Sequence, residues 1–192
     1  MKIGIDIDDT LAQTTNYLMP LAIKFDKNVL HKNGIVDCTK DLPRCFDWNS
    51  EELCLFFTMV FEKEVLNIPP MDKAKKVIKK LREDGNRIII ISSRNNIQLS
   101  NPYDITKKWL SINDIEFDKL IVNAKYKGSV VEEEKIDLLI DDSVGQCTFI
   151  ADNNKIPVVL YAKNTNQIKH QGITRLDNWE QIFNYILNLK NK

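Results

Sequence analysis

The feature that most constrains this sequence is its opening segment, in which an alternating apolar run carries paired carboxylates. Ile3, Ile5 and Ile7 alternate with other residues, as in a β-strand with one buried face. The same alternation puts Asp6 and Asp8 on the opposite side. Paired negative charge at a buried sheet edge is costly unless a proton or a cation compensates it. The segment therefore predicts a strand that ends at a cation site, and a metal ion is the simplest occupant.

A second acidic pair follows a later apolar run. Residues 136–140 are apolar except for Asp137, and Asp141 and Asp142 come directly after them. Ligands of open parallel sheets bind at the carboxyl ends of the strands. If this run and the first one form neighbouring strands, the two acidic pairs converge on one site.

Two further apolar runs, residues 87–91 and 120–122, lie between the acidic pairs. Each is followed by side chains that bind phosphate oxygens well, which are hydroxyls and a guanidinium after the first run and ammonium groups after the second. An acidic pair, a hydroxyl, a lysine and a second acidic pair therefore follow one another along the chain. The residues are Ser92, Ser93 and Arg94 after the first run, and Lys125 and Lys127 after the second.

Most of the remaining chain alternates predicted strands with predicted helices. This alternation favours an α/β fold with a Rossmann-like parallel sheet and helices on both faces. Apolar residues three and four apart predict a helix that begins at Ala74 and is ended by Gly85. A further strand is predicted at residues 157–161, and Asp177 with Glu180 predicts a capping box that starts the last helix.

The ordered set of motifs resembles the haloacid dehalogenase-like superfamily of phosphohydrolases. Its members carry D-x-D-x-T, a Ser or Thr at a strand end, a lysine and a late acidic pair, and this chain has all four. More narrowly, G-I-D-I-D-D-T-L, I-S-S-R and residues 127–142 resemble bacterial nucleotidases related to pyrimidine deoxyribonucleotidases. Those relatives often have Thr-Ala-Arg where this chain has Ser92-Ser93-Arg94, which makes the choice between the two serines less certain. Ser92 is the serine expected to hydrogen-bond a phosphoryl oxygen, with Ser93 and Arg94 as neighbours that can reach the substrate.

The resemblance implies a Mg²⁺-dependent phosphomonoester hydrolase that forms an aspartyl-phosphate. Asp6 is then the nucleophile, and Asp8 is the general acid and base. Lys127 is preferred to Lys125 as the cation that neutralises the phosphate, because its spacing to the late acidic pair matches those nucleotidases. Mg²⁺ prefers hard oxygen ligands. The predicted phosphate-binding residues are Ser92, Ser93, Arg94 and Lys127. The predicted metal ligands are Asp6, the main-chain carbonyl of Asp8, and Asp141, with Asp142 assisting through water or from outside the direct ligands.

Residues 11–70 do not fit the alternation, because they are helix-like and rich in aromatic side chains. In the resembling family, an insertion at this point is a small helical cap that selects the leaving group. We therefore expect a helical cap at 11–70 and a core domain formed by 1–10 and 71–192. Phe46 and Trp48 are the predicted substrate-binding residues, because their rings can stack on a base. Packing inside the cap is the alternative for Trp48, and is the expected role of Phe56, Phe57 and Phe61.

A 5′-nucleotidase acting on nucleoside or deoxynucleoside monophosphates is the activity that the resemblance favours, with a small-molecule phosphomonoester as its partner. A phosphatase of another small phosphometabolite, such as a sugar phosphate, is one alternative. A non-catalytic phosphoacceptor or phosphometabolite-binding protein is another, because a fold does not prove turnover. A phosphoacceptor, however, needs neither the second carboxylate of the first motif nor a helical cap.

Composition narrows the expected partners and location. The chain has 27 basic and 27 acidic residues, so its net charge gives no reason to expect a nucleic acid polymer or a membrane as a partner. No apolar stretch approaches the roughly 20 residues that span a bilayer, and the early carboxylates do not fit a signal peptide. We expect a cytoplasmic monomer or homodimer. Reduced thiols are expected at Cys38, Cys45, Cys54 and Cys147, which lack a metal-binding or redox spacing.

Overall fold

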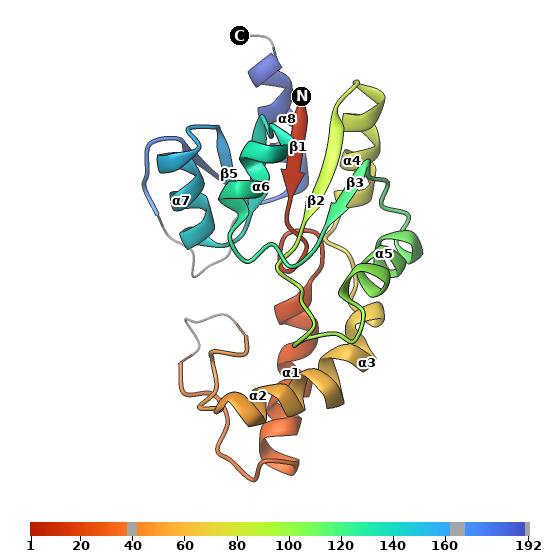
Figure 1. Cartoon of the computed structure of the whole chain (residues 1–192), viewed down its shortest axis with the longest axis vertical. Coiled ribbons are helices and arrows are strands. Elements are labelled where there is room, and N and C mark those ends of the chain that lie inside the picture. The colour runs from red at the N-terminus through yellow and green to blue at the C-terminus, as the bar shows by residue number, and fades with distance from the viewer. Residues whose placement is uncertain (38–41, 162–167, 191–192) are drawn as a thin grey trace.

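The computed structural model describes residues 1–37, 42–161 and 168–190. These ranges contain a six-stranded sheet in which every neighbouring pair of strands is parallel (Figure 1). In their order across the sheet, the strands are β3 (Lys119–Ile121), β2 (Arg87–Ile91), β1 (Lys2–Ile5), β4 (Leu138–Asp141), β5 (Val158–Tyr161) and β6 (Ile173–Leu176).

The sheet is buried on both faces. Along β2, Ile88 and Ile90 enter one hydrophobic cluster, whereas Ile89 and Ile91 enter another. Strands with this double burial are typical of parallel sheets covered by helices on both sides. The predicted α/β fold is therefore confirmed. The helices of the first cluster are α4 (Ala74–Glu83), α5 (Pro102–Ile112) and α8 (Trp179–Lys190), and those of the second are α6 (Lys127–Glu134) and α7 (Val144–Asn153).

The register of β1 against β4 brings the two acidic motifs to the same edge of the sheet. Ile5 pairs with Ile140, and the N–H of Asp6 continues the pairing by donating to the carbonyl of Ile140 at 3.0 Å. Asp6 and Asp141 therefore follow directly after paired residues. The strand itself ends at Ile5, earlier than the alternation predicts, so Asp6 begins a loop.

Residues 11–70, which we call the cap segment, form helices that lie apart from the sheet, at the lower end of Figure 1. The aromatic side chains of this segment belong to the same hydrophobic cluster as one face of the sheet. The indole N–H of Trp109 in α5 ties the two parts together by donating to the carbonyl of Ile68 at 2.8 Å. The elements are α1 (Thr14–Asn28), α2 (Ser50–Phe56), the π-helix η1 (Phe57–Phe61), α3 (Glu62–Glu64) and the 3₁₀-helix η2 (Val65–Asn67).

Local predictions outside the cap segment have mixed outcomes. The helix predicted from Ala74 is α4, and Gly85 follows it with a φ of 77°. The capping box at Asp177 and Glu180 is wrong, because the side chain of Asn178 accepts the hydrogen bond from the N–H of Gln181 at 3.0 Å. Strand β6 has no counterpart in the sequence prediction, because its short, half-buried edge position leaves only a weak apolar pattern.

Two expectations from composition concern membranes and thiols. In the part of the chain that the structure describes, no helix combines the length and the apolar character needed to cross a bilayer. Cys54 and Cys147 are free thiols, as expected, and Cys45 is buried. Cys38 lies outside the described residues.

Candidate active site

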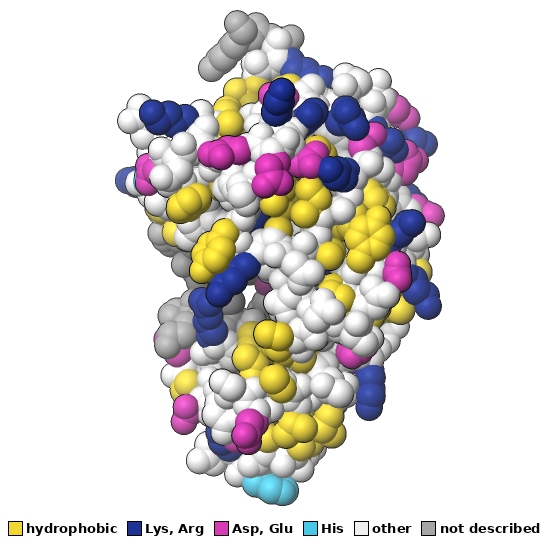
Figure 2. All heavy atoms as spheres, viewed as in Figure 1, with side chains coloured by type: hydrophobic (Ala, Val, Ile, Leu, Met, Phe, Trp, Pro, Cys, Tyr) yellow, Lys and Arg dark blue, Asp and Glu magenta, His cyan; other side chains and the backbone are white. Residues whose placement is uncertain are grey.

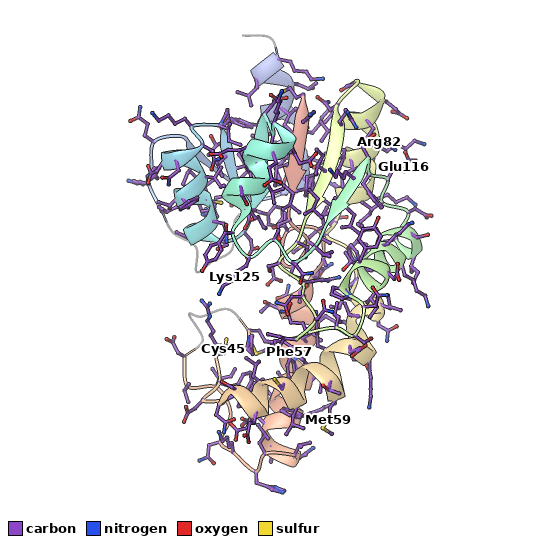
Figure 3. All side chains as sticks on the ribbon, in the orientation of Figure 1. Cys45, Phe57, Met59, Arg82, Glu116 and Lys125 are labelled. Carbon is purple, nitrogen blue, oxygen red and sulfur yellow. The ribbon has the colours of Figure 1, made fainter. Side chains whose placement is uncertain are left out.

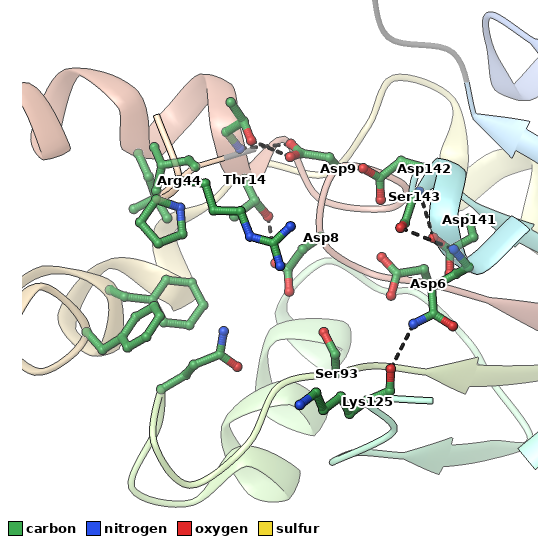
Figure 4. A pocket seen from close by; sticks show the side chains of 18 of the residues that line it. Asp6, Asp8, Asp9, Thr14, Arg44, Ser93, Lys125, Asp141, Asp142 and Ser143 are labelled. Carbon is green, nitrogen blue, oxygen red and sulfur yellow. Dashed lines mark hydrogen bonds between the residues drawn. The ribbon is translucent and has the colours of Figure 1, made fainter. Parts of the chain in front are cut away.

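A pocket of about 460 Å³ opens between the carboxyl ends of the strands and the cap segment (Figure 4). Its volume falls in the range of small-molecule sites. The core wall is polar, whereas the cap wall is mainly apolar. The core wall includes Asp6, Asp8, Asp9, Ser93, Lys125, Lys127, Asp141 and Asp142, and the cap wall includes Leu18, Leu42, Pro43, Arg44, Phe56, Phe57 and Phe61.

Three carboxylates meet at the core wall, and a lysine connects two of them. Asp6, Asp141 and Asp142 each offer an oxygen within 4.8 Å of the others. The ammonium group of Lys127 donates to Asp6 at 2.5 Å and also to Asp141. Because Lys127, Asp6 and Asp141 are all buried, these ion pairs are screened little by water. The structure thus brings together the residues of the first, third and fourth motifs.

The start of helix α6 positions Lys127. Its neighbour Gly128 allows α6 to approach α7 closely, since a Cβ at Gly128 would lie 2.6 Å from the ring of Phe149. The side chain of Gln146 in α7 donates to the carbonyl of Lys125 at 2.7 Å and fixes the preceding loop. Lys127 is therefore buried against the acidic cluster, while Lys125 lines the pocket with an exposed side chain.

Asp8 is held by an arginine from beneath the pocket. The guanidinium of Arg94 donates through Nε and Nη2 to the two carboxylate oxygens, at 2.9 and 2.7 Å, and the hydroxyl of Thr14 donates to the same carboxylate at 2.7 Å. Arg94 is fully buried and lies 5.8 Å from the ring centroid of Phe61 and 6.0 Å from that of Trp109. It was expected to bind phosphate, but its Nε and Nη2 are directed at Asp8, and it is not among the residues that line the pocket.

The two serines after β2 have different surroundings. Ser92 is fully buried, and its hydroxyl accepts a hydrogen bond from the N–H of Arg94 at 3.2 Å. Ser93 lines the pocket, where Figure 4 shows it between Asp8 and Lys125. Ser92, the serine expected to bind the phosphoryl oxygen, does not line the pocket, and Ser93 is the one of the two that faces the space a substrate would occupy.

The loop after β1 is fixed at several points. Asp9 adopts a left-handed conformation with a φ of 61°, and its carboxylate accepts hydrogen bonds from the N–H of Thr15, at 2.8 Å, and from the hydroxyl of the same residue. The indole N–H of the fully buried Trp179, in the last helix, donates to the carbonyl of Thr10 at 3.1 Å. These contacts hold the loop that carries Asp6 and Asp8.

The charges in the site shift its ionisation equilibria in opposite directions. Burial raises the pKa of Asp6 well above its usual value, Lys127 opposes this, and the neighbouring carboxylates of Asp141 and Asp142 raise it further. Burial also acts to raise the pKa of Asp8, but the charge and hydrogen bond of Arg94, together with Thr14 and Lys127, hold that pKa below the usual range. Desolvation lowers the pKa of Lys127 less than its two carboxylate partners raise it, so the lysine stays charged.

The acidic cluster has the chemistry of a site for a hard divalent cation. Asp6, Asp141 and Asp142 offer only oxygen ligands, which Mg²⁺ prefers. Three carboxylates and the single ammonium group of Lys127 leave this cluster with an excess of negative charge. A bound cation relieves such an excess, because it is the largest local charge in a site of this kind. The side chain of Asp8, in contrast, is engaged by Arg94 and does not belong to the cluster.

The predicted substrate-binding aromatics lie inside the cap segment and do not line the pocket. The rings of Phe46 and Trp48 stack on each other at a centroid distance of 4.4 Å, and the indole N–H of Trp48 donates to Asp26 at 2.6 Å. This placement gives their predicted role in substrate binding no support. Phe56, Phe57 and Phe61, which were expected only to pack, do line the pocket.

Several pocket residues were not anticipated from the sequence. Ser143 follows the late acidic pair and caps α7, and its N–H donates to Asp141 at 2.8 Å. A capping signal directly before the helix would have identified it. Thr14 would have been found as the first residue of a helix close to the first motif. Arg44 and Phe57 carry no such local signal, since only the folded chain brings them to the pocket.

Comparison with known proteins supports the resemblance predicted from the motifs. No family model matches the chain. It is 27% identical over 197 residues to the Bacillus subtilis protein named "Putative nucleotidase YqfW", a match that covers 99% of this chain and 95% of the relative. A Bacillus cereus protein named "Putative nucleotidase" is 24% identical over 191 residues, covering 95% of this chain and 96% of the relative.

Solved structures agree on the fold. A structure described as a predicted phosphatase from Clostridium acetobutylicum has a TM-score of 0.68 at 13% identity, covering 97% of this chain and 98% of the other. A haloacid dehalogenase superfamily hydrolase from Ehrlichia chaffeensis has a TM-score of 0.58 at 14% identity, covering 98% and 96%. The predicted resemblance to haloacid dehalogenase-like hydrolases is therefore confirmed, and the Rossmann-like architecture is shared with them.

Proposed function

We propose that this protein is a phosphatase that hydrolyses phosphomonoesters with Mg²⁺ and forms a phosphoryl-Asp6 intermediate. We further propose that its substrates are nucleoside or deoxynucleoside monophosphates. The observation that carries the proposal is the arrangement of Lys127 between Asp6 and Asp141, next to a separately anchored Asp8, at the floor of one pocket. Similarity over nearly the whole chain to proteins named nucleotidases supports the same activity.

The first step is nucleophilic attack by Asp6 on phosphorus. An oxygen of the carboxylate forms the new P–O bond while the bond to the leaving alcohol breaks. Lys127 offsets the negative charge that the phosphate brings beside Asp6, and it favours the ionised form of the nucleophile. Ser93 lines the pocket on the same side and can donate its hydroxyl to a phosphoryl oxygen. Positioning and charge neutralisation of this kind are the main requirements of phosphoryl transfer.

The second step is hydrolysis of the aspartyl-phosphate, for which Asp8 is the proposed base. Arg94 and Thr14 fix its carboxylate, and Arg94 holds its pKa low, so Asp8 is ionised and able to accept a proton from water. In the first step Asp8 is the proposed proton donor to the leaving alcohol. Because Asp8 is ionised in the free protein, the substrate's phosphate monoanion must supply that proton to Asp8, which then passes it to the leaving oxygen.

The proposed metal ligands are Asp6, Asp141 and Asp142, with the main-chain carbonyl of Asp8 as the fourth protein contribution. These groups fit Mg²⁺ by their hard oxygen donors and by the excess of negative charge around Asp6. When bound, the ion would supply neutralisation of charge on the phosphoryl oxygens.

The leaving group would lie against the cap wall. The aromatic rings of Phe57 and Phe61 line that wall, and a nucleobase offers a face that can pack on such rings. This observation favours a nucleotide over a fully polar substrate. A sugar phosphate is the second candidate, because the core wall has no feature that selects one alcohol over another.

The test is a substrate panel measured with purified protein and Mg²⁺. We expect hydrolysis of 4-nitrophenyl phosphate, and higher kcat/KM for nucleoside 5′-monophosphates than for hexose phosphates. Chelation of metal should lower the rate by about a hundredfold or more, because metal stabilisation of transferring phosphoryl groups contributes several kcal/mol. The Asp6→Asn variant provides the background rate.

Activity that survives exhaustive chelation would exclude the proposed metal site. Binding of phosphomonoesters without turnover would identify the protein as a phosphometabolite-binding protein.

A further inference from the structure

The cations around the pocket fall into two groups. Lys127 and Arg94 are bonded to carboxylates of the acidic site. Arg44 and Lys125 also line the pocket, yet within the described ranges neither forms an ion pair with a carboxylate. The ammonium group of Lys125 lies 5.4 Å from the ring centroid of Tyr126, and no carboxylate among the described residues pairs with it. Two positive charges in the pocket are therefore not used within the site.

These two cations come from opposite walls. Arg44 belongs to the cap segment, and Figure 4 shows it reaching into the pocket on the side away from Asp141 and Ser143. Lys125 belongs to the loop between β3 and α6, and Figure 3 shows it pointing from the core across the opening towards the cap segment. Figure 2 shows Lys and Arg side chains gathered where the surface is hollowed between these two parts. Both charges thus face the space beside the acidic cluster.

We propose that the substrate carries a second anionic group, a phosphate or a carboxylate, in addition to the phosphate that Asp6 attacks, and that Arg44 and Lys125 bind this second group. The inference rests on the proposed function, because it concerns the part of the substrate that is not transferred. An arginine side chain presents a planar set of donors that matches a phosphate or carboxylate, and Lys125 adds a point charge from the other wall.

The scissile phosphate does not account for these cations. That phosphate would lie beside Asp6, where Lys127 and the proposed metal ion would offset its charge, whereas Arg44 enters the pocket from the cap side, opposite Asp141 and Ser143, with its guanidinium end towards Asp8 (Figure 4). The apolar rings and side chains of Phe57, Leu42 and Pro43 line the cap wall and would face the body of the substrate. A simple nucleoside monophosphate would occupy the acidic and apolar parts and leave both outer cations without a partner. A nucleotide with a second anionic group would occupy the acidic and apolar parts of the pocket and would also pair with the two outer cations.

The experiment compares substrates that differ only in the second anion. Uridine 5′-monophosphate is the reference, uridine 3′,5′-bisphosphate adds a phosphate, and orotidine 5′-monophosphate adds a carboxylate. Glucose 6-phosphate and glucose 1,6-bisphosphate form a second pair with a different body. Initial rates with each are measured for the wild type and for Arg44→Gln and Lys125→Gln. Lys108→Gln is the matched control, because Lys108 is exposed on α5 and does not line the pocket.

We expect the wild type to have a higher kcat/KM for at least one doubly anionic substrate than for its partner. The ratio of kcat/KM for the doubly anionic substrate to kcat/KM for its singly anionic partner should fall about 10- to 100-fold in Arg44→Gln, as expected for a lost charge-assisted hydrogen bond. The same ratio should also fall in Lys125→Gln. It should not change in Lys108→Gln. A preference for the bisphosphate identifies the second group as a phosphate, and a preference for the orotidine nucleotide identifies it as a carboxylate.

The inference is wrong if no doubly anionic substrate is preferred, or if Arg44→Gln lowers kcat/KM equally for both members of a pair. The second result would mean that Arg44 attracts any phosphate. Hydrolysis of 4-nitrophenyl phosphate by the wild type distinguishes this failure from that of the proposed function. If the aryl phosphate is not hydrolysed either, both proposals fall.

Discussion

The two walls of the pocket differ in how their side chains are held. On the core wall, Asp6 is bonded to Lys127 at 2.5 Å and Asp8 to Arg94 at 2.7 and 2.9 Å, so each carboxylate has a fixed partner. On the cap wall, Arg44 has no carboxylate partner within the described residues, and Phe57 lines the pocket through its ring. A wall with fixed charges suits chemistry that is the same for every substrate. A wall with unsatisfied groups suits selection among substrates.

The largest effect should come from the core wall. Asp6→Asn removes the proposed nucleophile, and we expect hydrolysis of 4-nitrophenyl phosphate to fall about 10⁵-fold or more, as for loss of a nucleophile elsewhere. The fold should persist, because Lys127 keeps its bond to Asp141. Initial rates of hydrolysis check the loss of activity, and circular dichroism checks that the variant is folded.

Asp8→Asn is the comparison for Asp6→Asn, since it should slow hydrolysis of the intermediate and allow phosphorylated Asp6 to be trapped with an activated aryl phosphate. Mass spectrometry locates the phosphate. Its detection on Asp8, or a fully active Asp6→Asn variant, would reverse the roles assigned to these two residues.

An effect of intermediate size, on stability, is expected for Arg94, which pairs with Asp8 on the core wall and lies beside Phe61 of the cap wall. Arg94→Leu leaves Asp8 without its buried partner, and breaking such a pair lowers the free energy of unfolding by about 3 kcal/mol or more. Urea denaturation measures the loss. Arg82→Leu is the control, because Arg82 pairs with Glu116 and Asp118 near the surface, where ion pairs contribute about 1 kcal/mol or less.

The Arg94 effect should also depend on pH. Arg94 holds the pKa of Asp8 below its unfolded value of about 3.9. The pairing therefore stabilises the protein above about pH 4 and is lost as the pH falls through the folded pKa. The stability difference between wild type and Arg94→Leu should shrink at acid pH. A difference that is constant from pH 7 to pH 3 would mean that Arg94 acts by packing against Phe61 and Trp109 alone.

The smallest effect should come from the cap wall. Phe57→Leu should lower kcat/KM for a nucleotide about tenfold relative to 4-nitrophenyl phosphate, because stacking of a base on an aromatic ring contributes about 1 to 3 kcal/mol. Trp48→Leu should instead lower the free energy of unfolding and leave this ratio unchanged, since Trp48 packs on Phe46 away from the pocket. A changed ratio in Trp48→Leu and an unchanged one in Phe57→Leu would restore the role predicted for Trp48.

The same comparison explains what the sequence could predict. Residues that follow parallel strands meet at one edge whatever the rest of the fold, so Asp6 and Asp141 were placed together from local patterns alone. Lys127 was preferred to Lys125 because its spacing to the late acidic pair matches that in the resembling nucleotidases. To predict that these motifs meet at one site, it was enough to know which strands are neighbours in the sheet.

Other features depend on tertiary packing and leave no local trace. Arg94 follows a strand just as Ser93 does, and only the burial of its guanidinium beside Phe61 and Trp109 turns it towards Asp8. In the cap segment, Trp48 and Phe57 are both aromatic and a few residues apart, and nothing in the sequence distinguishes the ring inside from the ring at the pocket. The lesson is that a motif locates chemistry, while selectivity depends on contacts distant in the chain.

The hydrogen bond from the indole of Trp179 to the carbonyl of Thr10 has a consequence for how the protein is made. The strand that leads to Asp6 is translated before both of its neighbours in the sheet, β2 and β4, between which it lies. Trp179 leaves the ribosome 169 residues after Thr10. The nascent chain therefore carries this loop without the anchor that holds it while the next 169 residues are made, and the contact forms only once α8 has emerged.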